Sequence, residues 1–151
     1  MIGKIKKGSG FKGCVNYVLG KEQAVLLHAD GVLTESRSDI IRSFCMQTGM
    51  NPDLKKPVGH IALSYSAVDA PKLTDEKVVQ LAQEYMREMK ITDTQYIIVR
   101  HQDREHPDVY KRQDYIRSCH TLDQPSEYYK EKNIFQLVFV VSLVCPAVIR
   151  H

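Results

Sequence analysis

A long amphipathic helix between two apolar strands constrains the fold of this chain most strongly. Residues 73–91 place apolar side chains at helical spacing after Thr74, a favourable N-cap, and two acidic residues suited to a helix N-terminus. The preceding stretch, Lys55–Val68, alternates as a strand does, and Tyr96–His101 reads as a buried strand with His101 at its C-terminal end. Two strands joined through such a helix predict a sheet with packed helices, of the α/β or α+β class.

The N-terminal part adds shorter elements. Residues 1–7 alternate apolar and polar side chains, as an edge strand does, and residues 11–20 show the spacing of a short helix with Tyr17 at the edge of its buried stripe. Residues 24–33 fit a strand or an extended loop. A second helix begins after Ser36 or Ser38 and ends near Gly49. Its predicted apolar face consists of Ile40, Ile41, Phe44 and Cys45.

The pattern changes after Pro107. Residues 108–133 have no clean period, and residues 134–149 are apolar and read as a strand or a collapsed tail. That run is shorter than the roughly 18–20 residues of a membrane span, and Pro146 interrupts it. We therefore divide the chain into residues 1–107 and 108–151, and expect no membrane contact.

Composition limits the class of protein. A chain of 151 residues suits one domain, and 43% hydrophobic with 26% charged residues indicates a globular protein rather than a disordered one. The net charge of +3 is mild, but residues 1–21 carry five lysines and no acidic residue. This segment is either a solvated basic edge or a surface that faces phosphates.

Cysteine use and the N-terminus suggest a compartment. The chain has four cysteines, no two of which form a Cys-x-x-Cys pair, and all lie in or beside apolar runs. No signal peptide is recognisable, because the early lysines lead into Gly-Ser-Gly rather than into an apolar stretch. We expect a reduced, cytoplasmic protein with buried free thiols.

Three features could support phosphodiester chemistry. They are Tyr17 on a short helix after a basic glycine-rich turn, His101-x-Asp103 at a strand end, and the following loop Asp-Arg-Glu-His-Pro. A tyrosine hydroxyl can form a covalent intermediate when it is activated, and imidazoles can hold a metal that polarises the phosphate. Taken alone, each feature is more often a packed tyrosine or a structural or solvated His-x-Asp, so a small α/β domain without this chemistry is one alternative.

Taken together, these segments resemble a known family. The stretches GKIKKGSGFKGCVNYVLGK, KKPVGHIALSYSAVDAPKLTDE, LAQEYMREM and TQYIIVRHQDREHP are similar, in collinear order over residues 1–107, to relaxases (mobilization nucleases) of the Bacteroides type. The resemblance implies an α/β sandwich around an antiparallel sheet. It also implies site-specific nicking of one DNA strand at an origin of transfer, with a tyrosine that stays bound to the 5′ phosphate.

The resemblance also implies roles for individual residues. Tyr17 would be the nucleophile, His101 the first ligand of a divalent Mg²⁺ or Mn²⁺, and Asp103 the carboxylate that orients a ring. His60 and His106 are further candidates. The residues that would contact phosphates of single-stranded DNA are Lys4, Lys6, Lys12 and Arg100. Accessory mobilization proteins would be additional partners.

The chain departs from the family pattern after Pro107. The pattern has a His-hydrophobic-His strand there, paired beside residues 96–101 and supplying two more ligands, whereas this chain has Asp108-Val109-Tyr110. Asp108 is a weak substitute, suited to a hard cation. An edge would therefore stay open beside residues 96–101 unless residues 135–144 fill it, and the sequence does not decide that pairing.

The departure has a specific candidate cause. The peptide Asp-Val-Tyr-Lys-Arg-Gln (residues 108–113) is what the transposon mosaic-end adapter of sequencing libraries encodes, so residues 108–151 could be a chimaeric, non-native tail. Natural frameshift or divergence is the alternative. On either account the chain as written is expected to be inactive or nearly so, and a non-catalytic single-stranded DNA-binding remnant is the second functional hypothesis.

Overall fold

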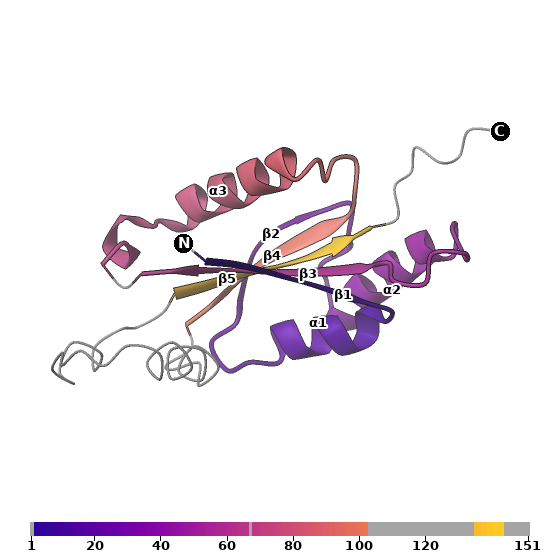
Figure 1. The fold of residues 1–151 in the computed structure, drawn as a ribbon. Helices are drawn as coiled ribbons and strands as arrows, with labels where there is room; N and C mark the ends of the chain where they lie inside the picture. Colours follow the sequence, from indigo (N-terminus) through magenta and orange to yellow (C-terminus); the bar gives the residue numbers. More distant parts are fainter. Residues whose placement is uncertain (1, 67, 103–134, 144–151) are drawn as a thin grey trace, which may run out of the picture.

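The computed structural model describes residues 2–66, 68–102 and 135–143, which form a five-stranded sheet with helices on both faces (Figure 1). The strands are β1 (Ile2–Gly8), β2 (Val25–Asp30), β3 (Val58–Tyr65), β4 (Tyr96–His101) and β5 (Phe135–Ser142). The helices are α1 (Phe11–Leu19), α2 (Arg37–Thr48) and α3 (Asp75–Glu88), with a short 3-10 turn, η1 (Ala70–Lys72). The strand order is β1-β3-β5-β4-β2, and every neighbouring pair is antiparallel. The predicted α+β class and the edge position of β1 are confirmed.

Each face of the sheet has its own apolar core. Helices α1 and α2 cover one face and α3 covers the other (Figure 1). Because side chains alternate along a strand, successive residues of β3, β4 and β5 contribute to opposite cores. The sheet residues of the α1 face are Val58, Ala62, Ile97, Val99, Val138 and Val140. Those of the α3 face are Ile61, Leu63, Tyr65, Ile98, Leu137, Phe139 and Val141.

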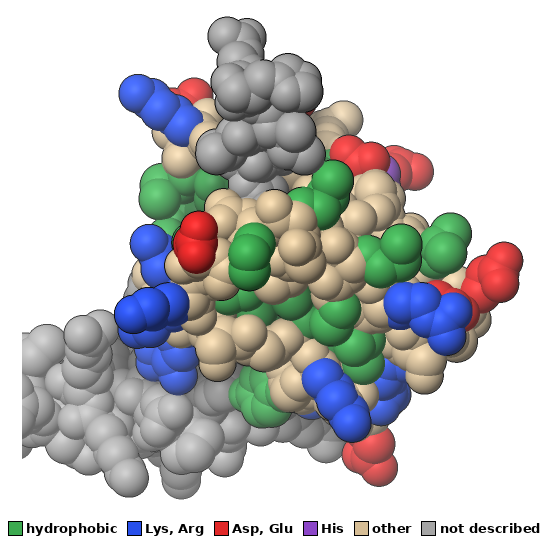
Figure 2. Space-filling model, turned by 90° about the vertical axis from the view of Figure 1, so that its right-hand side faces the viewer, with side chains coloured by type: hydrophobic (Ala, Val, Ile, Leu, Met, Phe, Trp, Pro, Cys, Tyr) green, Lys and Arg blue, Asp and Glu red, His purple; other side chains and the backbone are tan. Residues whose placement is uncertain are grey.

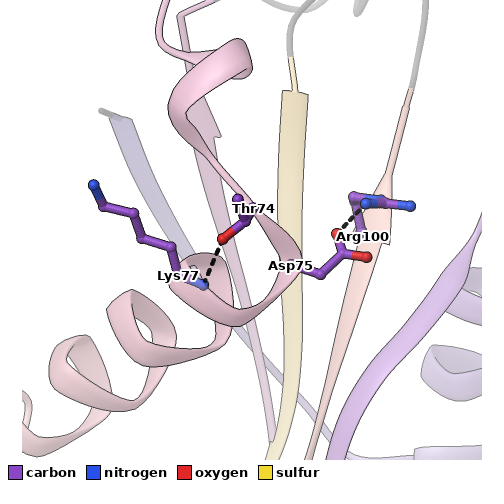
Figure 3. A network of polar contacts seen from close by, with 4 residues as sticks. All are labelled: Thr74, Asp75, Lys77 and Arg100. Carbon is purple, nitrogen blue, oxygen red and sulfur yellow. Dashed lines mark hydrogen bonds and ion pairs between the residues drawn. The ribbon is translucent and has the colours of Figure 1, made fainter.

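Two helices begin at the side-chain caps that the sequence indicates. The Ser36 hydroxyl accepts a hydrogen bond from the Asp39 backbone N–H at 3.1 Å. The Thr74 hydroxyl accepts one from the Lys77 backbone N–H at 3.3 Å (Figure 3). Both bonds satisfy amide groups that lack a partner in the first helical turn. Helix α1 differs, because it starts after Gly10 without a side-chain cap.

One part of the predicted core is wrong. Cys45 is exposed, although its position after Phe44 assigned it to the apolar face of α2, and Cys14 is only half-buried. Ile40 and Phe44 are the buried core residues of α2, and Ile41 packs against them partly buried. The Phe44 ring stacks on Phe11 of α1 with centroids 4.6 Å apart. The two cysteines that the structure describes are therefore free thiols but not fully buried ones.

Strand β5 forms the centre of the sheet. It pairs with β3 through eight positions and with β4 through six. Residues 137–141 are at most 1% exposed. The close approach to β3 depends on Gly59, since a Cβ there would lie 2.6 Å from Cγ2 of Val141. Residues 135–142 thus fill the place beside β4, a pairing that the sequence alone did not decide. The proposed boundary after Pro107 concerns the origin of the sequence and stays a prediction.

Candidate functional site

The last turn of α1 holds Tyr17 above the sheet. Two side chains from other elements donate to carbonyls at this helix end. His101 Nε2 of β4 lies 2.7 Å from the Val18 oxygen, and Arg37 of α2 lies 3.1 Å from the Leu19 oxygen. Such carbonyls have no partner within the helix, and a positive or donor group there complements the helix dipole. The backbone that carries Tyr17 is therefore fixed from two sides, while its ring is 54% exposed.

Tyr17 and His60 face each other across the α1 face. Their rings meet edge to face with centroids 6.2 Å apart. The Nζ atom of Lys21 lies 5.2 Å from the centroid of the Tyr17 ring, in the geometry of a cation–π contact. The nucleophile candidate thus lies between an imidazole and an ammonium group.

The surroundings of His60 are basic. Lys6 of β1 is directly opposite His60 in the antiparallel register, and opposite residues share a face. The pKa of His60 is lowered from its usual value, first by burial and then by the positive charges of Lys6, His101 and Lys21. At neutral pH the ring is therefore neutral.

The lowered pKa of His60 predicts a pH dependence of stability. The unfolded chain binds a proton at this histidine near its ordinary pKa of about 6.5, whereas the folded chain binds it only at lower pH. Protonation of His60 therefore has no effect on the free energy of unfolding above about pH 6.5. As the pH falls through that value, it lowers the free energy of unfolding, because the unfolded chain takes up the proton first. We expect His60→Gln to lose less stability than the unmodified chain between pH 7.5 and 5.5, measured by urea unfolding. Equal losses in both proteins would contradict the assignment.

A hydrogen bond takes up one of the two ring nitrogens of His101. The ring is 1% exposed, and its Nε2 donates to the Val18 carbonyl. In the neutral ring only Nδ1 then carries a lone pair. Within residues 2–66, 68–102 and 135–143, no group of three His, Cys, Asp or Glu side chains is placed to hold a metal ion.

The β5 register shows why the implied metal does not fit. Position 136 lies directly opposite His101, and position 138 lies opposite Val99. These positions carry Gln and Val, and Val138 is buried in the apolar core of the α1 face. A three-imidazole site needs nitrogen donors beside His101, and Val138 offers none. The donor set among the described residues therefore does not suit the divalent metal implied by the resemblance, and we assign it no step.

The other predicted residues are distributed over both faces. Lys4 and Lys6 are exposed on β1 opposite Ala62 and His60, and Lys12 is exposed on α1. Arg100 lies in β4 beside His101 but forms an ion pair with Asp75 at the start of α3, on the other face of the sheet (Figure 3). Asp103, His106 and Asp108 lie outside the described residues.

Charge and thiol chemistry elsewhere add little to this site. Figure 2 shows one end of the molecule, where basic, acidic and hydrophobic side chains are interspersed rather than gathered by type. Burial raises the pKa of Cys14 to about 11, so this thiol stays protonated at neutral pH and is a poor nucleophile. The chemically distinctive group is the set of Tyr17, His60, Lys6 and Lys21.

Comparison with known proteins identifies the class. A tyrosine held above an antiparallel sheet between basic groups suits a nuclease that acts on phosphodiesters. A family model described as "Relaxase: MobA/VirD2-like, nuclease domain" matches residues 17–129, about three quarters of the chain. The chain belongs to this relaxase nuclease family, which acts in DNA mobilization. No curated protein and no solved structure gave a significant match.

The family match begins at Tyr17 and runs past Pro107. It confirms the relaxase family inferred from the sequence, but it does not test the Bacteroides-type branch or the adapter hypothesis. Among the described residues, no helix is long and apolar enough to cross a membrane.

Lys21 was missed as a site residue. It directly follows the C-cap of α1, and the sequence gives it no distinguishing mark beyond its charge. It lies four positions after Tyr17 but beyond the end of α1, so helical spacing does not predict its contact with the Tyr17 ring.

Proposed function

We propose that Tyr17 is the nucleophile of a single-strand DNA nicking site at an origin of transfer, and that the chain as written nicks little or not at all. The single observation that supports the nucleophile is the position of Tyr17. Its exposed ring lies against His60, and the next residue in its helix accepts a hydrogen bond from His101. Two sequence-predicted candidates, Tyr17 and His101, thus meet at one helix end.

In the proposed reaction the Tyr17 hydroxyl attacks the scissile phosphorus. A bond forms between Oη and phosphorus, the bond from phosphorus to the 3′ oxygen breaks, and the phenol proton passes to a base or solvent while the 3′ oxygen gains one. The phenol needs activation, because its ordinary pKa is about 10. The neutral imidazole of His60 and the nearby lysines are the described groups that could assist.

The low activity that we propose follows from the lack of a second and third imidazole beside His101 among the described residues. Stabilising the charge on the phosphorane-like transition state is the usual task of the metal, and the α1 face has Val138 where a second imidazole would be needed. A nicking assay on supercoiled origin-of-transfer DNA with Mg²⁺ or Mn²⁺ is expected to show cleavage at background. Robust cleavage that Tyr17→Phe abolishes would overturn the inactivity and establish the nucleophile. Robust cleavage unchanged in Tyr17→Phe would remove Tyr17 from the mechanism.

A second function, non-catalytic binding of single-stranded DNA, is favoured by the exposed lysines. Lys4, Lys6 and Lys12 stay exposed, and no group of three metal-ligating side chains assembles within residues 2–66, 68–102 and 135–143. Each phosphate neutralised contributes about −0.7 to the slope of log affinity against log salt for single strands. Salt-dependent binding of an oligonucleotide without cleavage would support this function. We further propose a cytoplasmic location and accessory mobilization proteins as partners.

The origin of residues 108–151 has its own test. We propose that the gene is joined to unrelated DNA after the Pro107 codon, motivated by the peptide Asp-Val-Tyr-Lys-Arg-Gln. Resequencing the locus without transposon-based fragmentation is expected to give a different continuation with a His-hydrophobic-His strand. Recovery of the same six codons would end the adapter hypothesis.

A further inference from the structure

Strand β1 forms one edge of the sheet. All seven of its residues pair with β3 in a continuous register, and within the described residues no strand lies on its other side. In Figure 1 this strand runs in front of the rest of the sheet, with α3 above and α1 below. Residues 3–7 are all exposed. A regular, exposed edge presents unpaired backbone N–H and C=O groups, which are a template for one more strand.

The opposite edge, β2, is less suited to strand addition. The register of β2 against β4 shifts between Leu26 and His28. A bulge of this kind bends the strand and interrupts its ladder. Residues 26–29 of β2 are also only partly exposed. Bulges are one of the devices that protect an edge from pairing, so β1 is the edge whose backbone is better placed for a partner.

The side chains of β1 define the chemistry of an added strand. Lys4 and Lys6 lie on the α1 face of the sheet, whereas Ile5 and Lys7 lie on the α3 face. Ile5 is 43% exposed. Residues 1–21 contain no acidic residue that could neutralise these lysines from within the segment. Because opposite charges and apolar pairs stabilise neighbouring strands, this edge favours a strand that carries alternating acidic and apolar side chains.

We propose that β1 is a docking edge for an extended acidic segment of another protein, which adds to the sheet beside the five described strands. Backbone hydrogen bonds to β1 give the contact its affinity, and pairing of carboxylates with the exposed lysines selects the segment. The inference is independent of the proposed nicking reaction, since Tyr17 takes no part in it.

A second copy of the chain fits this edge less well than an acidic segment. When two β1 strands overlap fully in antiparallel register, Lys4 of one chain lies opposite Lys6 of the other. Like charges directly opposite each other destabilise a strand pair.

A single DNA strand also fits the edge less well. Its phosphates can use the lysine charges, but the lysines of β1 are divided between the two faces of the sheet. The sugar-phosphate backbone also offers no N–H donor to the C=O groups of β1, whereas a peptide strand satisfies both the donors and the acceptors of an edge.

Fluorescence anisotropy with the full chain tests the docking edge. The probe is a labelled peptide of alternating glutamate and valine with the length of β1. The matched peptide has two adjacent central backbone nitrogens methylated, which keeps its charge and blocks both edges of the strand. We expect saturable binding of the first peptide and roughly tenfold weaker binding of the methylated one, because backbone hydrogen bonds are lost.

Matched charge reversals locate the contact. Lys6→Glu is expected to weaken the glutamate-valine peptide by roughly two- to thirtyfold, since one attractive cross-strand pair becomes repulsive, and to strengthen a lysine-valine peptide. Arg42→Glu changes the net charge equally at an exposed position of α2, which packs on α1 and β5. It is expected to leave both peptides within about twofold of their original affinity, because salt screens distant charges. Urea unfolding checks that both variants remain folded.

Several outcomes would overturn the docking edge. They are no peptide binding, equal binding of the methylated peptide, or equal effects of the two charge reversals. Lys6-dependent binding of oligothymidylate but not of the peptide would make β1 a DNA surface instead. Protection of the β1 amides from hydrogen exchange that rises with the concentration of the chain alone would show that a second copy covers the edge.

Discussion

Phe139→Ala is expected to lower the free energy of unfolding by about 3–5 kcal/mol, the usual cost of emptying a buried aromatic site. Phe139 is fully buried in β5, and its ring lies 6.3 Å from that of Tyr85 in α3. Because whole domains are stable by only about 5–15 kcal/mol, this variant should be close to unfolded at 37 °C. Urea unfolding followed by circular dichroism measures the loss.

The matched control keeps most of the volume. Phe139→Leu should cost less than about 1.5 kcal/mol, as near-isosteric core changes do. A chain that ends at Pro107 gives an independent check, since it leaves β3 and β4 without the strand between them. We expect that chain to show no cooperative transition. Normal stability of Phe139→Ala or of the shortened chain would show that β5 is dispensable.

His101→Leu is the second change with a large expected effect, about 1–3 kcal/mol of unfolding free energy. The leucine fills similar space but leaves the buried Val18 carbonyl without the donor at 2.7 Å. The last turn of α1 should loosen, and Tyr17 with it. Urea unfolding gives the stability, and the NMR signals of Tyr17 report the local change.

A chelator separates this structural role from metal binding. If His101 acts through Val18, the loss in His101→Leu is the same with and without EDTA, and EDTA does not affect the unmodified chain. If EDTA destabilises the unmodified chain and not the variant, His101 is a metal ligand and the structural assignment is wrong. His28→Leu, on β2, is the control histidine change and should cost less, because His28 has no comparable buried hydrogen bond among the described residues.

Helix caps and the spacing of apolar residues predicted helices α2 and α3 well, because these features depend on neighbouring residues in the sequence. Thr74 and Ser36 begin α3 and α2 because their hydroxyls replace helical partners that the first turn lacks. The spacing of Val78, Ala82 and Met86 identified the buried side of α3 correctly. Met89, which continues the same apolar stripe, was wrongly expected in the core, because it lies at the end of the helix and is 46% exposed. These features depend on residues within a few positions of each other, which a single sequence displays directly.

Contacts between distant segments could not be predicted in this way. The insertion of β5 between β3 and β4 depends on register and on the missing Cβ of Gly59, neither of which a periodic pattern encodes. Cys45 was assigned to a core because it follows Phe44, yet the packing of α2 uses a narrower stripe than its apolar residues suggest.

The sequence indicated individual site residues but not the contacts between them. Tyr17, His60 and His101 were all selected from the sequence, and the structure places them on one face of the sheet. Their partners were not foreseen. The Val18 carbonyl accepts a hydrogen bond from one ring nitrogen of His101, a contact that depends on how α1 docks against the sheet. Lys21 reaches the Tyr17 ring from just beyond the end of α1, where no helical spacing indicates the contact.

The strand order has a consequence for synthesis of the chain. On the ribosome, β1 and β3 can pair early and β2 and β4 can pair later, but the two halves share no hydrogen-bonded neighbour until β5 has left the exit tunnel. Until then the inner edges of β3 and β4 are unprotected, and such edges invite pairing with other chains. We therefore expect a nascent chain that depends on chaperone binding, and whose yield falls when translation slows just before β5.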